Sequence, residues 1–159
     1  MLVAPLPGNV DPRQPQSAHQ VAPTPAPDPR MALLRRPDPR WWELGPAAPP
    51  TPEQRAVIDP GWSLPTAFPL LVGPDGRALG HLRAAVVADH LHLSQLAVAP
   101  PARRRGFGRA LVSASFAWGR GHGARWAVLQ VAVHNVDALA FYDRLGFVEH
   151  HRYRYLAPP

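Results

Sequence analysis

The 159-residue sequence contains no cysteine and no lysine. Without cysteine, the chain cannot form disulfides, a thiolate zinc site, an iron–sulfur cluster or a cysteinyl acyl-enzyme. Without lysine, it has neither a Schiff-base nucleophile nor the lysine of a nucleotide-binding P-loop. Long apolar runs are also missing, because stretches such as residues 84–88 are far shorter than a membrane span. We therefore expect no membrane-spanning helix. The N-terminus lacks a basic segment followed by a long apolar one, so we expect a cytoplasmic protein.

Proline is abundant but unevenly distributed, with sixteen of the 22 prolines in residues 1–66. The alternating prolines of residues 23–29 favour an extended chain and exclude a helix. This composition predicts a Pro-rich disordered tail or linker over residues 1–30 and a single domain over residues 31–159. Met31 stands where the apolar pattern begins, and one hypothesis is that translation starts there.

Positive charge is concentrated in the last third of the chain. Residues 1–99 carry eight arginines and eight acidic residues, whereas residues 100–159 carry nine arginines and three acidic residues and so account for the net charge of +6. Such an imbalance indicates an anionic ligand, whether a phosphate, a nucleotide or a nucleic acid.

Two local patterns near the start of the predicted domain are typical of helix N-termini. Asp38 precedes Pro39, which combines an N-cap side chain with proline in the first turn. Thr51 and Gln54 have the spacing of a capping box. The strand and the two helices predicted for this part of the chain cover residues 31–35, 39–45 and 52–58.

From residue 66 onward the pattern is typical of one sheet with helices. Apolar runs separated by short turns predict three antiparallel strands. A helical period then begins at Gly108, and the nearly all-apolar run that follows is typical of a buried parallel strand after a crossover helix. The later strands are expected over residues 68–72, 77–88, 91–98, 126–133 and 147–156, with a last helix over residues 137–145. The fold class is thus α/β (α+β), a mixed, largely antiparallel twisted sheet of about six strands in the order β-α-α-β-β-β-α-β-α-β, with helices on both faces.

A basic, glycine-containing loop at residues 103–109 joins the third of these strands to the helix. Helix N-termini present free N–H groups with partial positive charge, glycine lets an anion approach the backbone, and arginine binds phosphate. The segment therefore predicts a diphosphate site. A dinucleotide fingerprint would need glycine at Leu111, and a P-loop would need lysine. An RNA-binding segment and a merely solvated helix start remain alternatives.

A second motif follows the buried strand. Its residues Asn135, Ala138 and Tyr142 lie at helical spacings of three and four. Together the two motifs resemble the GNAT superfamily of acyl-CoA-dependent N-acetyltransferases, whose phosphate loop reads Gln/Arg-x-x-Gly-x-Gly/Ala and whose later motif reads Asn…Ala…Tyr…Gly-Phe. The matching residues are Arg103, Gly106 and Gly108, then Asn135, Ala138, Tyr142, Gly146 and Phe147. The resemblance covers residues 66–156, and the ending is similar to the second half of tandem two-domain members. This similarity implies that part of the acceptor site is either missing or supplied by a second chain.

The resemblance implies acetyl-CoA as cosubstrate, with its pantetheine between the strands predicted at residues 91–98 and 126–133. Backbone groups of the first strand would bind the pantetheine, and the amides of the loop would bind the pyrophosphate. Tyr142 would donate a proton to the leaving thiolate. The implied cofactor-binding residues are Leu96, Ala97, Val98, Arg103, Arg104, Arg105, Gly106, Phe107, Gly108, Arg109, Asn135 and Ala138. We expect no metal, since no histidine has ligand spacing with carboxylate support.

The general base is the least determined part of the site. His92 is a candidate because the ordinary pKa of an imidazole suits a base near neutral pH, although an exposed or cross-strand histidine is the simpler interpretation. The residues and the resemblance together favour transfer of an acetyl group to a primary amine, in a small molecule or a peptide, by direct attack in a ternary complex. A non-catalytic acyl-CoA-binding module or an incomplete half of a two-domain enzyme remains an alternative, and a nucleic-acid binder is a less favoured one. A homodimer through an exposed edge strand also remains open.

Overall fold

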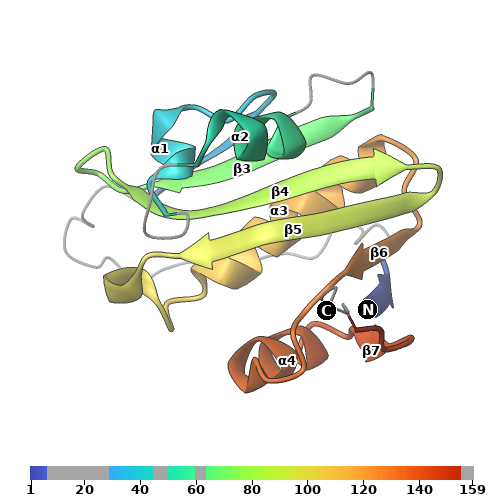
Figure 1. The fold of residues 1–159 in the computed structure, drawn as a ribbon. Coiled ribbons are helices and arrows are strands. Elements are labelled where there is room, and N and C mark those ends of the chain that lie inside the picture. The colour runs from blue at the N-terminus through green and yellow to red at the C-terminus, as the bar shows by residue number, and fades with distance from the viewer. Residues whose placement is uncertain (7–28, 45–49, 60–63, 155–159) are drawn as a thin grey trace, which may run out of the picture.

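A twisted sheet forms the frame of the protein. The computed structural model describes residues 1–6, 29–44, 50–59 and 64–154. Over these residues the strands are β1 (Leu2–Pro5), β2 (Arg30–Leu34), β3 (Thr66–Val72), β4 (Ala78–Val87), β5 (His90–Val98), β6 (Trp126–Leu129) and β7 (Val148–Glu149). They form one sheet in the order β2-β3-β4-β5-β6-β1-β7 (Figure 1). Every neighbouring pair is antiparallel except β5 and β6, which confirms the predicted mixed, largely antiparallel sheet.

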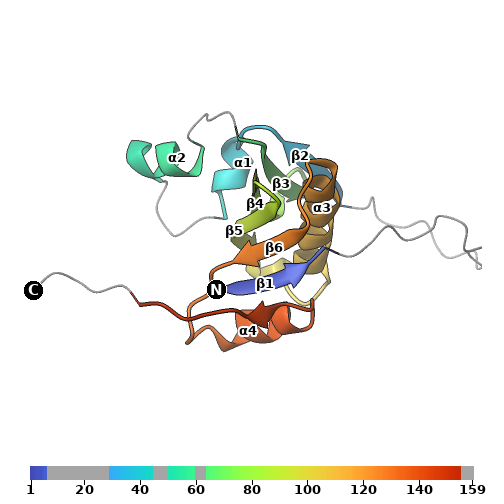
Figure 2. The same cartoon turned by 90° about the vertical axis from the view of Figure 1, so that its right-hand side faces the viewer.

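The described helices cover both faces of this sheet. They are α1 (Pro39–Trp42), α2 (Pro52–Ile58), α3 (Phe107–Gly121) and α4 (Val136–Asp143), with a short 3-10 turn at Pro100–Ala102. The helix α3 is the crossover between the parallel strands β5 and β6, as predicted. Figure 2 shows α1 and α2 on one side of the sheet and α3 on the other. Apolar residues of α3 and α4 share one core with β1, β4, β5 and β6, and α1 packs in a smaller core with β3.

The predicted capping signals begin both early helices. The Asp38 carboxylate accepts a hydrogen bond from the Trp41 amide at 3.1 Å. Thr51 and Gln54 form a reciprocal capping box, with each side chain bonded to the other residue's amide. The helix α2 has the predicted bounds, whereas α1 ends at Trp42 rather than at residue 45.

The N-terminus departs from the prediction. Residues 1–30 were expected to form a disordered tail, but β1 lies between β6 and β7 in the sheet (Figure 2). Leu2 and Ala4 are buried in the core, so the first residues contribute a seventh strand to a sheet expected to have about six. Side chains alternate between the two faces of a strand, and Leu2 and Ala4 are the apolar residues of β1 that face the core. Residues 7–28 of the predicted tail lie outside the described residues.

Two predicted strands are shorter in the structure. The strand expected at residues 126–133 ends at Leu129, and the strand expected at 147–156 is reduced to Val148–Glu149. The first ends early because its partner β5 diverges from it beyond Leu93. The second pairs with β1 at only two positions, Leu2 with Glu149 and Val3 with Val148.

Candidate active site

The two parallel strands β5 and β6 separate in the middle of the sheet. They pair over four positions, from His90 opposite Trp126 to Leu93 opposite Leu129. Beyond this point, Gln95 adopts a positive φ of 55°, and the register between β4 and β5 shifts. Residues 94–98 therefore have no strand neighbour on the β6 side among the described residues. Their backbone polar groups on that side are available to a ligand, because an unpaired strand edge retains its hydrogen-bonding capacity.

The loop after β5 presents an anion-binding helix start. Gly106 is the N-cap of α3 with φ of 82°, a conformation that glycine adopts at little cost. No side chain caps this helix, and no acidic residue lies in its first turn. The first backbone N–H groups of α3 and its dipole are therefore free to bind a negative charge. A Cβ built on Gly106 meets no atom within 4 Å, so the space in front of the helix is open.

The four arginines of this loop differ in their contacts and in their exposure to solvent. Arg103 donates from Nε to the Val98 carbonyl at 3.2 Å and so ties the loop to the end of β5. The Arg105 guanidinium lies over the Phe107 ring at 4.9 Å. Arg104 and Arg109 are exposed. The loop is thus strongly cationic, as the sequence predicts, but Arg103 already has a partner on the strand itself.

The second motif lies next to this loop. The Asn135 side chain accepts a hydrogen bond from the Ala138 amide at 3.2 Å and is the N-cap of α4. A Cβ on Gly108 would lie 3.3 Å from Phe141 Cζ and 3.8 Å from Val98 Cγ2, so glycine here allows α3, α4 and β5 to approach closely. The structure therefore brings the two sequence motifs together at the end of β5.

Tyr142 is largely buried at the end of α4, with 9% of its surface exposed. Its ring makes edge contacts with Phe141 and Phe147. Burial raises the pKa of its phenol to about 12, because the charged phenolate would lose its hydration. The hydroxyl is therefore protonated throughout the neutral range and is available as a hydrogen-bond donor.

His92 lies on β5 two residues before Ser94, on the face opposite α3. Its ring is exposed and lines a shallow hollow with Trp126 and Val128. Partial burial, His90 and Arg83 all lower its pKa, since each disfavours the imidazolium. His92 is thus a neutral imidazole near pH 7.

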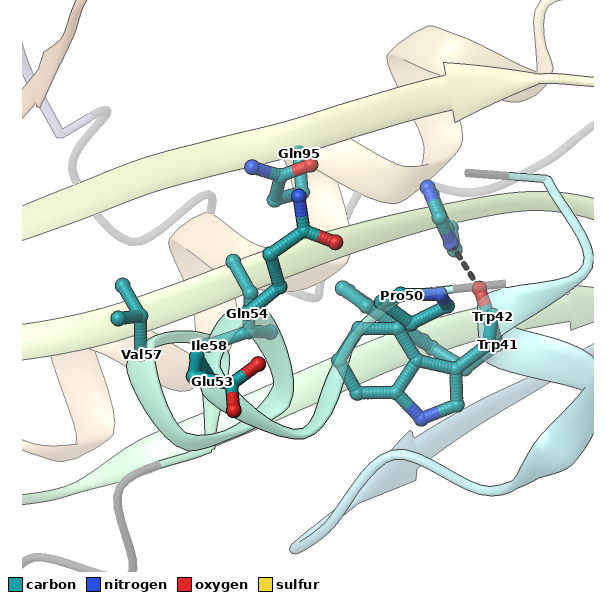
Figure 3. Close-up of a pocket in the computed structure, with 9 residues that line it drawn as sticks. Trp41, Trp42, Pro50, Glu53, Gln54, Val57, Ile58 and Gln95 are labelled. Carbon is teal, nitrogen blue, oxygen red and sulfur yellow. Dashed lines mark hydrogen bonds between the residues drawn. The ribbon is translucent and has the colours of Figure 1, made fainter. Parts of the chain in front are cut away.

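A second hollow was missed by the sequence reasoning. A cavity of about 350 Å³ lies between the early helices and the sheet (Figure 3), and Trp41, Trp42, Val57 and Ile58 supply its apolar walls. Glu53 and Gln54 of α2 also line it. The Trp41-Trp42 pair was a signal for such a cavity, because adjacent tryptophans on a short helix rarely both fit inside a core.

His81 and Gln95 lie on the strand side of the same cavity. His81 is only 2% exposed, and its Nδ1–H donates to the Trp41 carbonyl. Burial lowers the pKa of this imidazole, so its neutral form is favoured. The hydrogen bond to Trp41, forty residues away in the sequence, distinguishes His81 from an ordinary strand histidine. A local sequence pattern does not reveal such a contact.

Two classes of site find no support in the part of the chain that the structure describes. Its histidine and acidic residues form no group of three or more that could hold a metal ion. No described helix combines the length and apolarity that crossing a membrane requires.

The separated parallel strands and the helix start beyond them define the GNAT acyltransferase fold. An aminoglycoside acetyltransferase, AAC(6')-Iy bound to a CoA-containing bisubstrate analogue, matches with a TM-score of 0.67 at 21% identity over 84% of this chain and 99% of that one. An acetyltransferase from Trypanosoma brucei matches with a TM-score of 0.66 at 23% identity over 82% of this chain and 100% of that one. The ribosomal-protein-S18-alanine N-acetyltransferase of Escherichia coli matches with a TM-score of 0.65 at 26% identity over 77% and 79% of the two chains.

The sequence identifies the family more narrowly. A family model described as "Probable histone acetyltransferase Rv0428c C-terminal" matches residues 7–156. The chain belongs to this family, and the predicted GNAT relationship is confirmed. Among curated proteins, none matches the sequence.

Proposed function

We propose that this protein is an N-acetyltransferase that moves the acetyl group of acetyl-CoA to a primary amine by direct attack in a ternary complex. One observation carries the proposal: β5 and β6 separate beyond Leu93 and Leu129, and the unpaired edge leads to the uncapped start of α3 at Gly106. A strand edge for the pantetheine amides and free N–H groups for the pyrophosphate are what this cosubstrate requires.

In this arrangement the cosubstrate is bound mainly by backbone groups. Residues 96–98 offer the open strand edge, and the amides of Phe107, Gly108 and Arg109 lie in the first turn of α3. The exposed guanidiniums of Arg104 and Arg109 add charge-assisted bonds to phosphate. Asn135 orders the start of α4 through Ala138, beside the loop.

The chemistry then needs a proton donor and a proton acceptor. Tyr142 supplies the donor, because its hydroxyl remains protonated at neutral pH. An ordinary thiol has a pKa of about 8.5, so a thiolate is a weaker base than a phenolate with a pKa near 12. Tyr142 therefore stabilises the departing sulfur chiefly by a hydrogen bond, and complete transfer of its proton to the thiolate is not required.

His92 supplies the proton acceptor in this proposal. It is neutral near pH 7, and its exposed ring exchanges protons with water. Side-chain alternation puts it on the same face as Ser94, which is the first residue of β5 beyond the pairing with β6. A proton leaves the attacking amine more easily when such a base lies nearby.

One observation favours a second candidate function. Residues 90–98 of β5 contain no carboxylate, and a site without a strong base fits a non-catalytic acyl-CoA-binding module. The two functions differ in turnover. Because the chain has no cysteine, a thiol reagent detects released CoA without background from the protein. Amine-dependent thiol release supports the enzyme, whereas acetyl-CoA binding without release across a broad amine panel supports the module.

A further inference from the structure

The cavity between α2 and the sheet lies beside the strand segment that the proposed function assigns to the cosubstrate. His81 of β4 is the register partner of Ala97, and Gln95 is the residue at which β5 leaves its regular path. Both residues line the cavity. A molecule in this cavity would therefore contact the face of β5 opposite α3, where β5 and β6 have separated.

The cavity is apolar and carries little charge. Two indole rings and the aliphatic side chains of Val57 and Ile58 form most of its wall (Figure 3). Glu53 is the only carboxylate among the described lining residues, and it is exposed to solvent. Residues 45–49 and 60–63, which flank α2 in the sequence, contain no acidic or basic residue. A polycation would lose its hydration here without gaining several opposite charges, which is a large cost.

His81 adds one directional polar group. Its Nδ1–H is bonded to the Trp41 carbonyl, so in the neutral ring Nε2 carries the lone pair. A neutral imidazole nitrogen accepts a hydrogen bond from one N–H group. It carries no negative charge, so it does not offset the lost hydration of a second positive charge on the acceptor. The volume of about 350 Å³ is at the low end of the range for small-molecule sites, which fits one ring or a short chain rather than several sugar rings.

We propose that the acceptor is a small primary amine with a single amino group on an aryl or alkyl body, bound in the cavity formed by Trp41, Trp42, Val57 and Ile58. This inference rests on the proposed acetyl transfer. In that reaction the amine nitrogen forms a bond to the acetyl carbonyl carbon and the carbon–sulfur bond breaks. One amine proton and the thiolate together give CoA thiol, with no other reactant needed.

The test compares acceptors in the full-length protein by thiol release and by mass of the product. Phenethylamine, tryptamine and hexylamine represent the apolar class, and an aminoglycoside and a lysine-containing histone-tail peptide represent the cationic classes. We expect kcat/KM for the best apolar amine to exceed that for either cationic acceptor by about tenfold or more, a preference of about 1.4 kcal/mol. A higher kcat/KM for the aminoglycoside or the peptide would overturn the inference.

A pair of charge substitutions on α2 locates the binding site. Val57 is 75% exposed and lines the cavity, whereas Ala56 is also exposed on the same helix but does not line it. Val57→Glu should raise the KM for the apolar amine about tenfold. Ala56→Glu, which adds the same charge to the same helix, should leave this KM within about twofold. Equal effects of the two substitutions would overturn the inference.

Calorimetric titration with acetyl-CoA separates this inference from the proposed function. If the protein binds acetyl-CoA but acetylates no apolar amine, the acceptor assignment fails and the cosubstrate site stands. If the protein neither binds acetyl-CoA nor releases thiol with any acceptor, the proposed function fails, and the acceptor assignment fails with it.

Discussion

Leu93 on β5 and Leu129 on β6 form the last register pair between the two parallel strands. Up to this pair the strands share an ordinary ladder, and beyond it the edge of β5 has no strand partner among the described residues. The same edge ends in the Arg103–Gly108 loop, where the Arg103 side chain bonds back to Val98. In the proposed function, the pairing limit at Leu93 and Leu129 determines where the cosubstrate binds.

The proposed role of Tyr142 predicts a separation of catalysis from binding. Tyr142→Phe keeps the ring that packs against Phe141 and Phe147 and removes only the hydroxyl. We expect kcat to fall about 100-fold, the low end of general acid effects, because departure of the thiolate loses its donor. The Kd for acetyl-CoA and the thermal midpoint should stay close to those of the parent. The exposed Tyr153, changed to Phe, is the control. Unchanged turnover in Tyr142→Phe would remove this residue from the mechanism.

The proposed role of His92 predicts a change in the pH profile. Ionisation of an ordinary amine gives log kcat/KM a slope of one below the amine pKa. Since the pKa of His92 lies below its ordinary value of 6.5, the slope should increase to two only in acidic solution, where the imidazole becomes protonated. His92→Gln should lower kcat/KM and keep a slope of one.

The neighbouring His90, changed to Gln, serves as the control for that profile. Because His90 contributes to the lowered pKa of His92, its removal should move the break to higher pH without abolishing it. A break that persists unchanged in His92→Gln would assign the acid limb to another group.

Burial of His81 predicts acid-sensitive stability. Its pKa is below 6.5 in the folded protein and near 6.5 in the unfolded chain, so between these values the unfolded chain binds more protons. The free energy of unfolding should therefore decrease as the pH falls below 6.5 and should be unaffected by His81 above it. His81→Asn keeps a donor for the Trp41 carbonyl but does not titrate. In urea unfolding at pH 7.5 and 5.5, it should lose less stability on acidification than the parent does. An equal loss in both proteins would contradict the prediction.

The N-terminal strand predicts a stability effect far from the candidate site. Leu2 is 6% exposed in the core, whereas Pro5 of the same strand is exposed. Leu2→Ala should cost about 2–4 kcal/mol of unfolding free energy, as other core truncations do. Pro5→Ala should change it by less than about 0.5 kcal/mol. Urea unfolding measures both, and a Leu2→Ala variant as stable as the parent would show that β1 does not support the sheet.

The features that the sequence predicted correctly are mostly local. Asp38 and Thr51 are helix caps whose partners lie three residues away, so their roles follow from spacing. The antiparallel strands β3–β5 were predictable because short turns join their apolar runs. The crossover helix α3 was predictable because its apolar residues follow a helical period. The two glycine-containing motifs also identified the family correctly.

The features that the sequence did not predict depend on long-range contacts. The four residues of β1 become a strand only because β6, more than a hundred residues later, offers an edge. His81 becomes a buried neutral group only because Trp41 covers it. The strand β6 likewise ends at Leu129, where its pairing with β5 stops, and the positive φ of Gln95 lies just beyond that point on the other strand. None of these partners is visible from local sequence patterns.

The proposed function requires that acetyl-CoA binds between β5 and β6, with its diphosphate at the start of α3. The most direct test is calorimetric titration of acetyl-CoA into the parent protein, Gly106→Glu and Gly76→Glu. Gly106 and Gly76 have φ values of 82° and 79°, and a Cβ at either meets no atom within 4 Å, so the two substitutions carry matched strain and charge. We expect micromolar binding to the parent and to Gly76→Glu, and binding weakened about 100-fold or more in Gly106→Glu. Absence of binding to the parent, or equal binding to both variants, would contradict it.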